Sequence, residues 1–241
     1  MIRLFIVALL SGTVSLAFAY VVINNELSVS ASQSTAKIDQ QIEDILKIID
    51  DLPSDPSCPD EVKREYADIA HENERIRAVG YVFDAGEQWH VCSMFGKTLS
   101  KLNYWSGAKV EDVFVGRSLL TVHFPETSFV VGKESGNLKA FAYVNPRRVL
   151  GYWIEPSLPY ANYSLRLDGE NVPAYTRAPV ELQSMLLKSA HSKKYPYSIQ
   201  SAASIVDMLK RAGVYWLRLL IAIFFIWSSF GLLRRSILKP T

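Results

Sequence analysis

The sequence predicts an α+β fold: an outer domain whose membrane-proximal helices pack on an antiparallel sheet, flanked by two transmembrane helices. Two apolar runs, at residues 4–23 and 212–233 of the 241, enclose a polar segment long enough to fold as one domain with a core. Within that segment, helical periodicity comes first and strand-like runs separated by turn residues follow. Short strands joined by turns pair most readily as hairpins, so the sheet is expected to be antiparallel.

Each apolar run is long enough to cross a bilayer as a helix. The first run carries no charge, and the second is interrupted only by Arg218, which is close enough to one end to reach the membrane surface. Basic residues lie beyond both runs, which predicts cytoplasmic termini and a central segment on the outer side, although Lys210 and Arg211 oppose this bias. The basic residues that support it are Arg3, Arg234, Arg235 and Lys239.

These features divide the chain into an anchor at 1–23, an outer domain at 24–211, a second transmembrane helix at 212–233 and a short tail at 234–241. A cleaved signal peptide is the alternative for the first run, because Ala17-Phe18-Ala19 looks like a cleavage site after a short basic start. Residues 20–23 continue the apolar run beyond that site, which favours an uncleaved anchor. The domain faces outward in both cases.

Two helices are predicted at the start of the outer domain. After a polar exit at residues 24–34, isoleucines recur at helical spacing from Ala36 onward. A second helix is predicted to begin with Ser57 as its cap, with Pro59 at an early helical position and Asp60 at the capping-box position. The isoleucines of the first helix are Ile38, Ile42, Ile45 and Ile49.

Strand-like runs dominate the rest of the domain, with turns predicted at 84–87 and 134–137 and a hairpin signal at Asp168-Gly169. Helical segments are expected at 145–153, with Asn145 as a cap, at 179–188, and at 204–211 leading into the second span. The predicted strands are 77–83, 88–94, 118–124, 128–133, 138–145, 162–167, 172–176 and 195–200.

The chain has only two cysteines, Cys58 at the start of the second predicted helix and Cys92 near the end of a predicted strand. On the oxidising side of a membrane, a lone pair of cysteines predicts a disulfide. Closing this ring would restrict the unfolded chain by about 4 kcal/mol on the chain-entropy model. The sequence leaves open whether the bond is a structural staple or is reduced under some condition, since strain and exposure set its potential.

A metal site is the alternative use of these residues. His90 and Cys92 would point to one face of a strand, and Cys58 and His71 could complete a ligand set, but no Cys-x-x-Cys spacing supports this. A catalytic Cys/His pair would need a thiol that stays reduced in an oxidising compartment. His123 and His191 have no obvious partners, and no phosphate loop or paired-carboxylate motif occurs. We therefore predict no catalytic residue, metal or cofactor, and the net charge of +2 predicts no nucleic-acid partner.

The two-span layout, the cysteine before a helix and the run Cys92-Ser93-Met94-Phe95-Gly96 after a hairpin together resemble the CSS-motif domain. That domain is the periplasmic sensory module of bacterial EAL-type cyclic diguanylate phosphodiesterases. By this resemblance, Cys58 matches the first cysteine of the family, Cys92 the motif cysteine, Ser93 the first motif serine and Gly96 the following glycine. Met94 replaces the second serine, and the EAL domain is missing. Outer domains between two spans are often PAS-like or Cache-like, which the order of elements fits.

The resemblance implies a two-pass protein of the bacterial inner membrane, whose periplasmic disulfide restrains an enzyme until it is reduced. We therefore predict a non-enzymatic, redox-responsive regulator of cyclic diguanylate signalling that acts on a separate phosphodiesterase chain. Periplasmic thiol oxidoreductases and a second copy of the chain are further expected partners. Small residues on one face of the first span would allow two copies to approach closely. These are Ala8, Gly12, Ser15 and Ala19.

Two other functions stay open at this stage. The chain could be the N-terminal part of a truncated cyclic diguanylate phosphodiesterase. It could also be a periplasmic ligand-binding module with a purely structural disulfide, since some of its aromatic residues could line a small-molecule pocket. Those aromatic residues include Trp89, Tyr104, Trp105, Tyr152 and Trp153.

Overall fold

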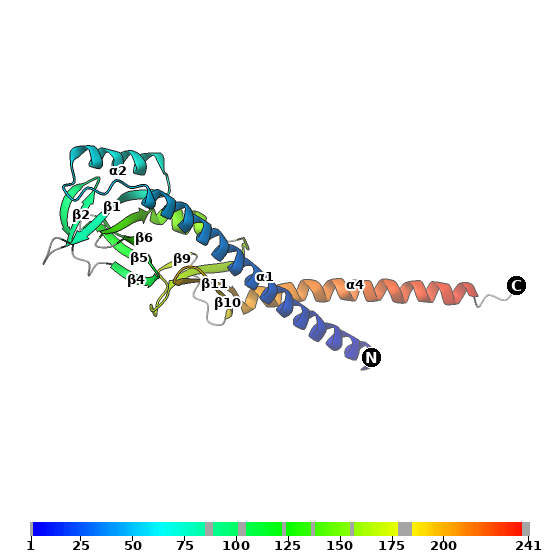
Figure 1. The fold of residues 1–241 in the computed structure, drawn as a ribbon. Helices are drawn as coiled ribbons and strands as arrows, with labels where there is room; N and C mark the ends of the chain where they lie inside the picture. Colours follow the sequence, from blue (N-terminus) through cyan, green and yellow to red (C-terminus); the bar gives the residue numbers. More distant parts are fainter. Residues whose placement is uncertain are drawn as a thin grey trace.

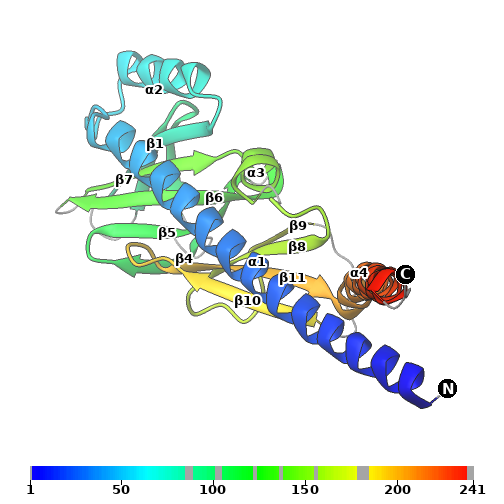
Figure 2. The same cartoon turned by 90° about the vertical axis from the view of Figure 1, so that its right-hand side faces the viewer.

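The computed structural model describes residues 2–84, 89–100, 105–121, 124–135, 138–154, 157–177 and 185–237 (Figure 1). Two antiparallel sheets pack along one long N-terminal helix, α1 (Ile2–Asp50). A second long helix, α4 (Ile205–Ile237), leaves the same end of the domain from which α1 enters (Figures 1 and 2). The predicted α+β fold, with terminal helices packed on antiparallel strands, is therefore confirmed.

The larger sheet has seven strands in the order β3-β2-β1-β7-β6-β5-β4, with antiparallel neighbours throughout. The helix α2 (Asp60–Glu72) packs against β1 and β2. The strands are β1 (Ile76–Asp84), β2 (Trp89–Ser93), β3 (Gly96–Ser100), β4 (Trp105–Val110), β5 (Val113–Thr121), β6 (Phe124–Ser135) and β7 (Leu138–Val144).

The smaller sheet has four antiparallel strands in the order β10-β11-β8-β9 and lies nearer to α4. A short helix, α3 (Pro146–Arg148), and a π-helical turn (Val149–Trp153) follow the larger sheet. The side chain of Asn145 accepts a hydrogen bond from the backbone N–H of Arg147 at 3.0 Å, which confirms the predicted cap. The strands are β8 (Ala161–Leu167), β9 (Tyr175–Arg177), β10 (Met185–His191) and β11 (Tyr197–Ser204).

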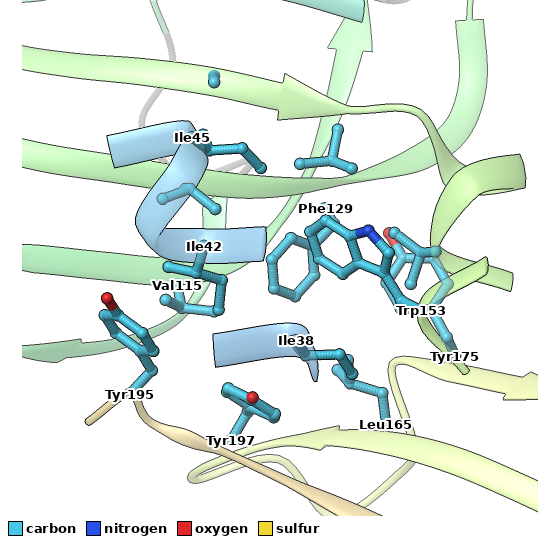
Figure 3. Packing of buried hydrophobic residues seen from close by; sticks show 14 of the residues in the cluster. Ile38, Ile42, Ile45, Val115, Phe129, Trp153, Leu165, Tyr175, Tyr195 and Tyr197 are labelled. Carbon is cyan, nitrogen blue, oxygen red and sulfur yellow. The ribbon is translucent and has the colours of Figure 1, made fainter. Parts of the chain in front are cut away.

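The isoleucine stripe of α1 is buried between the two sheets (Figure 3). Ile38 and Ile42 are 0% exposed, and Ile45 is 1% exposed. Figure 3 shows this stripe beside Phe129 of the larger sheet and Tyr197 of the smaller sheet. Burial of each such side chain stabilises the fold by about 1.5–3 kcal/mol. One continuous core therefore includes α1 and both sheets.

Polar contacts fix α1 against the smaller sheet at two levels. The hydroxyls of Tyr197 and Ser192 both donate to one carboxylate oxygen of Asp39, each at 2.7 Å. Nearer the N-terminus, the hydroxyl of Ser201 donates to the backbone carbonyl of Leu27 at 2.8 Å. These partly or fully buried bonds specify how α1 is aligned along the sheet, which apolar contacts alone do not.

The structure corrects the predicted starts of both N-terminal helices. Residues 24–34, predicted as a polar exit, belong to the continuous helix α1. Leu27 and Ala31 are 0% exposed there, so packing overrides the weak helical propensity of a serine-rich segment. The helix α2 begins at Asp60 with Pro59 as N-cap and no side-chain cap, so the prediction that Ser57 caps it is wrong.

Further differences concern strands. The described part of the predicted helix 179–188 belongs to β10, because residues from Met185 onward pair with β11. β3 and β4 were not predicted, and β5 begins at Val113 rather than near residue 118. The Asp168-Gly169 hairpin is confirmed by the pairing of β8 with β9. The turns at 84–87 and 134–137, the segment 179–184 and His123 lie wholly or partly outside the described residues.

Candidate functional site

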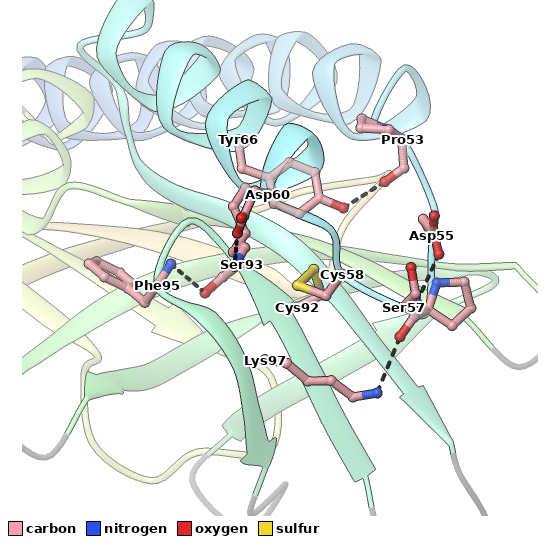
Figure 4. The surroundings of a disulfide bond; sticks show 12 residues. Pro53, Asp55, Ser57, Cys58, Asp60, Tyr66, Cys92, Ser93, Phe95 and Lys97 are labelled. Atoms are coloured by element: carbon pink, nitrogen blue, oxygen red, sulfur yellow. Dashed lines mark hydrogen bonds and ion pairs between the residues drawn. A yellow bond between two sulfur atoms is a disulfide. The ribbon is translucent and has the colours of Figure 1, made fainter.

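Cys58 and Cys92 are joined in a disulfide, with their Cα atoms 5.6 Å apart (Figure 4). Cys92 is the residue before the last of β2, opposite Tyr81 of β1 and Lys97 of β3. Cys58 lies in residues 51–59, the segment between α1 and α2, which we call the strap. The bond therefore ties the strap to the sheet just before α2 begins, eight residues after the end of α1.

The residues after Cys92 form the tight turn that ends β2. Ser93 and Gly96 pair across the β2–β3 hairpin, with Met94 and Phe95 between them. The hydroxyl of Ser93 accepts a hydrogen bond from the backbone N–H of Phe95 at 3.3 Å. Gly96 has a φ of 95°, a conformation that favours glycine. These two motif residues thus shape the hairpin that presents Cys92.

Met94, which replaces the second serine of the resembling motif, has an apolar environment. Its partly buried side chain packs against hydrophobic clusters on both faces of the larger sheet. A flexible thioether suits such an irregular position. A hydroxyl at this position would have to be desolvated, so methionine fits the site better than serine does.

Three backbone carbonyls of the strap accept hydrogen bonds from side chains of the neighbouring elements. Burial raises the pKa values of Tyr66 and Tyr81, which keeps both phenols protonated as donors. The strap is thereby held at several points before Cys58. The bonds run from Tyr81 to Leu52 at 2.8 Å, from Tyr66 to Pro53 at 2.6 Å and from Lys97 to Pro56 at 3.3 Å.

The disulfide is shielded from solvent by this arrangement. Cys58 is 6% exposed and Cys92 is 1% exposed. Thiol–disulfide exchange requires a thiolate to attack one of the two sulfur atoms directly, so access limits its rate. Reduction of this bond therefore requires a local opening around it, and each hydrogen bond that holds the strap opposes opening of the strap by about 1 kcal/mol.

Cys58 has an unusual backbone conformation, with a φ of 55°. This left-handed region costs a non-glycine residue about 1–2 kcal/mol. The turn is closed by a hydrogen bond from the backbone N–H of Cys58 to the carbonyl of Asp55 at 3.0 Å. The carboxylate of Asp55 accepts a hydrogen bond from the backbone N–H of Ser57 at 2.8 Å. Ser57 is therefore part of this turn of the strap and does not cap α2.

The described residues form neither the alternative metal site nor a catalytic Cys/His pair. The disulfide leaves neither sulfur as a thiolate, and His90 stacks on Phe83 with ring centroids 5.6 Å apart. Over the described ranges, no group of three or more His, Cys, Asp or Glu side chains could hold a metal ion. Trp153 belongs to the core, and the exposed Tyr152 lies under the ammonium of Lys37. The side chains of Trp89, Tyr104 and Trp105 lie outside the described set.

Sequence reasoning missed a charged pocket of about 430 Å³ where α1 meets α4. At its centre the carboxylate of Glu26 accepts hydrogen bonds from Arg211, at 2.5 Å, and from the hydroxyl of Tyr160. Partial burial opposes ionisation of Glu26, but these two donors lower its pKa overall. No motif or periodicity in the sequence indicates that Glu26 and Arg211, which are 185 positions apart, would pair. The other charged residues that line the pocket are Asp207, Lys210 and Arg218.

Two of the described helices, α1 and α4, are long and apolar enough to cross a membrane by length and composition. They pack together: the indole N–H of Trp216 contacts the hydroxyl of Ser11 at 2.9 Å, and the rings of Phe18 and Tyr215 meet edge to face. On α1, Ser15 and Ala19 are 3% and 0% exposed. The small-residue face that was expected to pair two copies therefore lies against α4 of the same chain.

We expect Cys58→Gly/Cys92→Ala protein to be more stable than Cys58→Ala/Cys92→Ala protein by roughly 0.5–1 kcal/mol. Glycine relieves about 1–2 kcal/mol of left-handed strain but loses about 0.4–1 kcal/mol through the entropy of the unfolded chain. Both variants lack the bond and should be less stable than wild type by about 4 kcal/mol. Urea unfolding followed by tryptophan fluorescence measures these differences. Equal stability of the two variants would mean that residue 58 changes conformation once the bond is lost.

No family model matches this chain, and no curated protein matches it in sequence. Among solved structures, the chain is similar to the "extracellular domain of the putative histidine kinase rpHK1S-Z16", with a TM-score of 0.53 at 13% sequence identity. The alignment covers 79% of this chain and 96% of that domain. At this identity the likeness concerns the fold alone. The chain thus has the fold of an extracellular domain of this kind, joined at both ends to long apolar helices.

Proposed function

We propose that this chain is a membrane-anchored, non-enzymatic regulator whose outer domain responds to thiol redox conditions through the Cys58–Cys92 bond. The carrying observation is the place of that bond, which fixes the strap between α1 and α2 to the larger sheet. α1 is one helix of 49 residues that continues into the first apolar run. The state of the bond is therefore coupled to a rigid element that reaches the membrane.

The mechanism rests on strap opening. With the bond intact, the strap holds the end of α1 and the start of α2 on the larger sheet. Reduction removes the restriction that the bond places on the unfolded chain between the two cysteines, which is worth about 4 kcal/mol, and raises the population of open forms by up to roughly a thousandfold. An open strap frees the end of α1 and exposes backbone to proteases. The change then reaches the first span through the helix itself.

We place residues 24–211 in the bacterial periplasm, with both spans in the inner membrane and both termini in the cytoplasm. This placement is supported by the apolar surfaces of α1 and α4 and by the oxidised cysteine pair. A reporter fused at Gly136, which lies outside the described residues, should be active on the outer side. A reporter fused after Thr241 should be active in the cytoplasm. A Gly136 fusion that reports a cytoplasmic location would overturn the topology.

We assign the output to cyclic diguanylate signalling. The support is the resemblance of Cys58 and the run Cys92-Ser93-x-x-Gly96 to the CSS motif. In this chain Ser93 and Gly96 form the turn that follows Cys92. The phosphodiesterase is carried by a separate chain or by further residues of this one, and periplasmic thiol oxidoreductases reset the bond. A ligand-binding module with a structural staple is the second candidate, and the burial of both sulfur atoms favours it.

Tyr66→Phe should speed reduction of the bond by roughly fivefold. The substitution removes the hydroxyl that holds the carbonyl of Pro53, which is worth about 1 kcal/mol, and leaves the apolar packing of the ring in place. The rate is measured by trapping free thiols during exposure to a membrane-impermeant phosphine at low concentration. Only a mechanism in which the strap opens before reduction predicts this acceleration.

Tyr163→Phe is the matched control. Its hydroxyl contacts that of Ser30 on α1 at 2.5 Å, so the variant also loses a buried hydrogen bond, but one in the smaller sheet. It should be reduced at the wild-type rate. If Tyr66→Phe and Tyr163→Phe are accelerated equally, reduction follows general unfolding and the local role of the strap is wrong.

Cys58→Ala and Cys92→Ala should each shift cellular cyclic diguanylate in the same direction and speed proteolysis of the outer domain. Either substitution removes the same bond, so the double variant should add nothing to the single ones. The nucleotide is quantified by mass spectrometry and the turnover by immunoblotting after translation is blocked. Wild-type turnover together with an unchanged nucleotide level would assign the bond to the structural-staple function.

A further inference from the structure

The pocket between α1 and α4 holds more positive charge than its carboxylates neutralise. Three cations and two carboxylates line it. Glu26 is engaged by Arg211 and Tyr160. Asp207 accepts a hydrogen bond from the hydroxyl of Ser204 at 2.6 Å, and its other carboxylate oxygen forms a long, solvent-exposed ion pair with Lys210 at 3.9 Å. Within the part of the chain that the structure describes, Arg218 has no ion-pair partner. The pocket therefore has unused capacity for an anion.

The surroundings of Arg218 indicate where the pocket lies relative to the membrane. Arg218 follows Arg211 by seven residues, which is two turns along the same face of α4. Its neighbours Leu217 and Ile221 are 59% and 48% exposed, as expected for a surface that faces lipid. An unpaired arginine beside hydrocarbon is costly, and its long side chain extends toward the polar headgroups where a counter-charge is found.

The lining combines phosphate-binding groups with an apolar wall. Guanidinium and ammonium groups bind phosphate oxygens through charge-assisted hydrogen bonds. Tyr160 and Tyr215 supply aromatic rings of the type that gathers at membrane interfaces, and Ile23 and Val214 supply apolar surface. A small soluble anion would use only the cations, whereas a phospholipid would use the whole lining.

We propose that this pocket binds the phosphate headgroup of an anionic phospholipid in the outer leaflet of the membrane that holds α1 and α4. Arg218 and Lys210 contact the phosphate, while Ile23 and Val214 contact the glycerol and the first part of the acyl chains. The proposal depends on the membrane placement in the proposed function, but not on its redox mechanism. It makes the junction of the two spans sensitive to lipid composition.

The test uses the full chain, purified in a mild detergent, delipidated and titrated with phosphatidylglycerol or phosphatidylcholine. Native mass spectrometry counts the retained lipids. Wild-type protein should retain phosphatidylglycerol roughly tenfold more tightly than phosphatidylcholine, and Arg218→Gln should lose about tenfold of the phosphatidylglycerol affinity. Lys210→Gln, at an exposed position, should lose affinity in the same direction, and it keeps the test valid if Arg218→Gln protein fails to fold.

Arg147→Gln is the charge-matched control, because Arg147 is exposed on α3 in the outer domain and away from α4. It should bind phosphatidylglycerol like wild type. Equal retention of the two lipids, or equal losses in Arg147→Gln and Arg218→Gln, would overturn the proposal. Displacement of the lipid by millimolar inorganic phosphate would assign the pocket to a soluble anion instead.

The titration is repeated with the Cys58–Cys92 bond intact and after reduction. Its result is then compared with the cellular cyclic diguanylate assay, which reports the thiol-dependent output of the proposed function. Selective lipid binding without a thiol-dependent output would refute the redox mechanism and leave the lipid site standing. A thiol-dependent output without lipid selectivity would do the reverse.

Discussion

The structure depends on the burial of one face of α1 between two sheets that have no strand in common. Ile38, Ile42 and Ile45 are the contact through which the larger and the smaller sheet share one core. A polar residue at any of these positions would leave an unpaired group in that core. Because the helix is continuous from Ile2 to Asp50, the element that assembles the domain also carries an apolar run long enough to cross a membrane.

The disulfide lies in the segment that follows this helix, just before α2. Its contribution of about 4 kcal/mol is a large share of the net stability of a typical domain, which is about 5–15 kcal/mol. Yet both sulfur atoms are shielded by a strap that is pinned by side-chain hydrogen bonds from Tyr66, Tyr81 and Lys97. Opening of the strap would have to break these contacts, and it would also release the left-handed backbone of Cys58.

The other end of α1 shows how the chain connects the outer domain to its spans. Glu26, Arg211 and Tyr160 bring together α1, α4 and the segment before β8 in one hydrogen-bonded cluster. Below it, the small residues of α1 pack on α4 of the same chain, so a second copy would have to use another face of these helices. A movement of α1 would therefore be transmitted to α4 through this hydrogen-bonded cluster.

The sequence by itself determined the apolar runs, the isoleucine stripe, the Asp168-Gly169 hairpin and the one cysteine pair, because each is written in local periodicity, turn chemistry or composition. Only the tertiary structure decided that residues 24–34 are helical, that residues from Met185 form a strand, and that Glu26 meets Arg211. In each case the deciding contact comes from residues distant in the chain. Local propensity is worth a few tenths of a kcal/mol per residue, whereas burial and strand pairing contribute more, so tertiary contacts prevail where the two disagree.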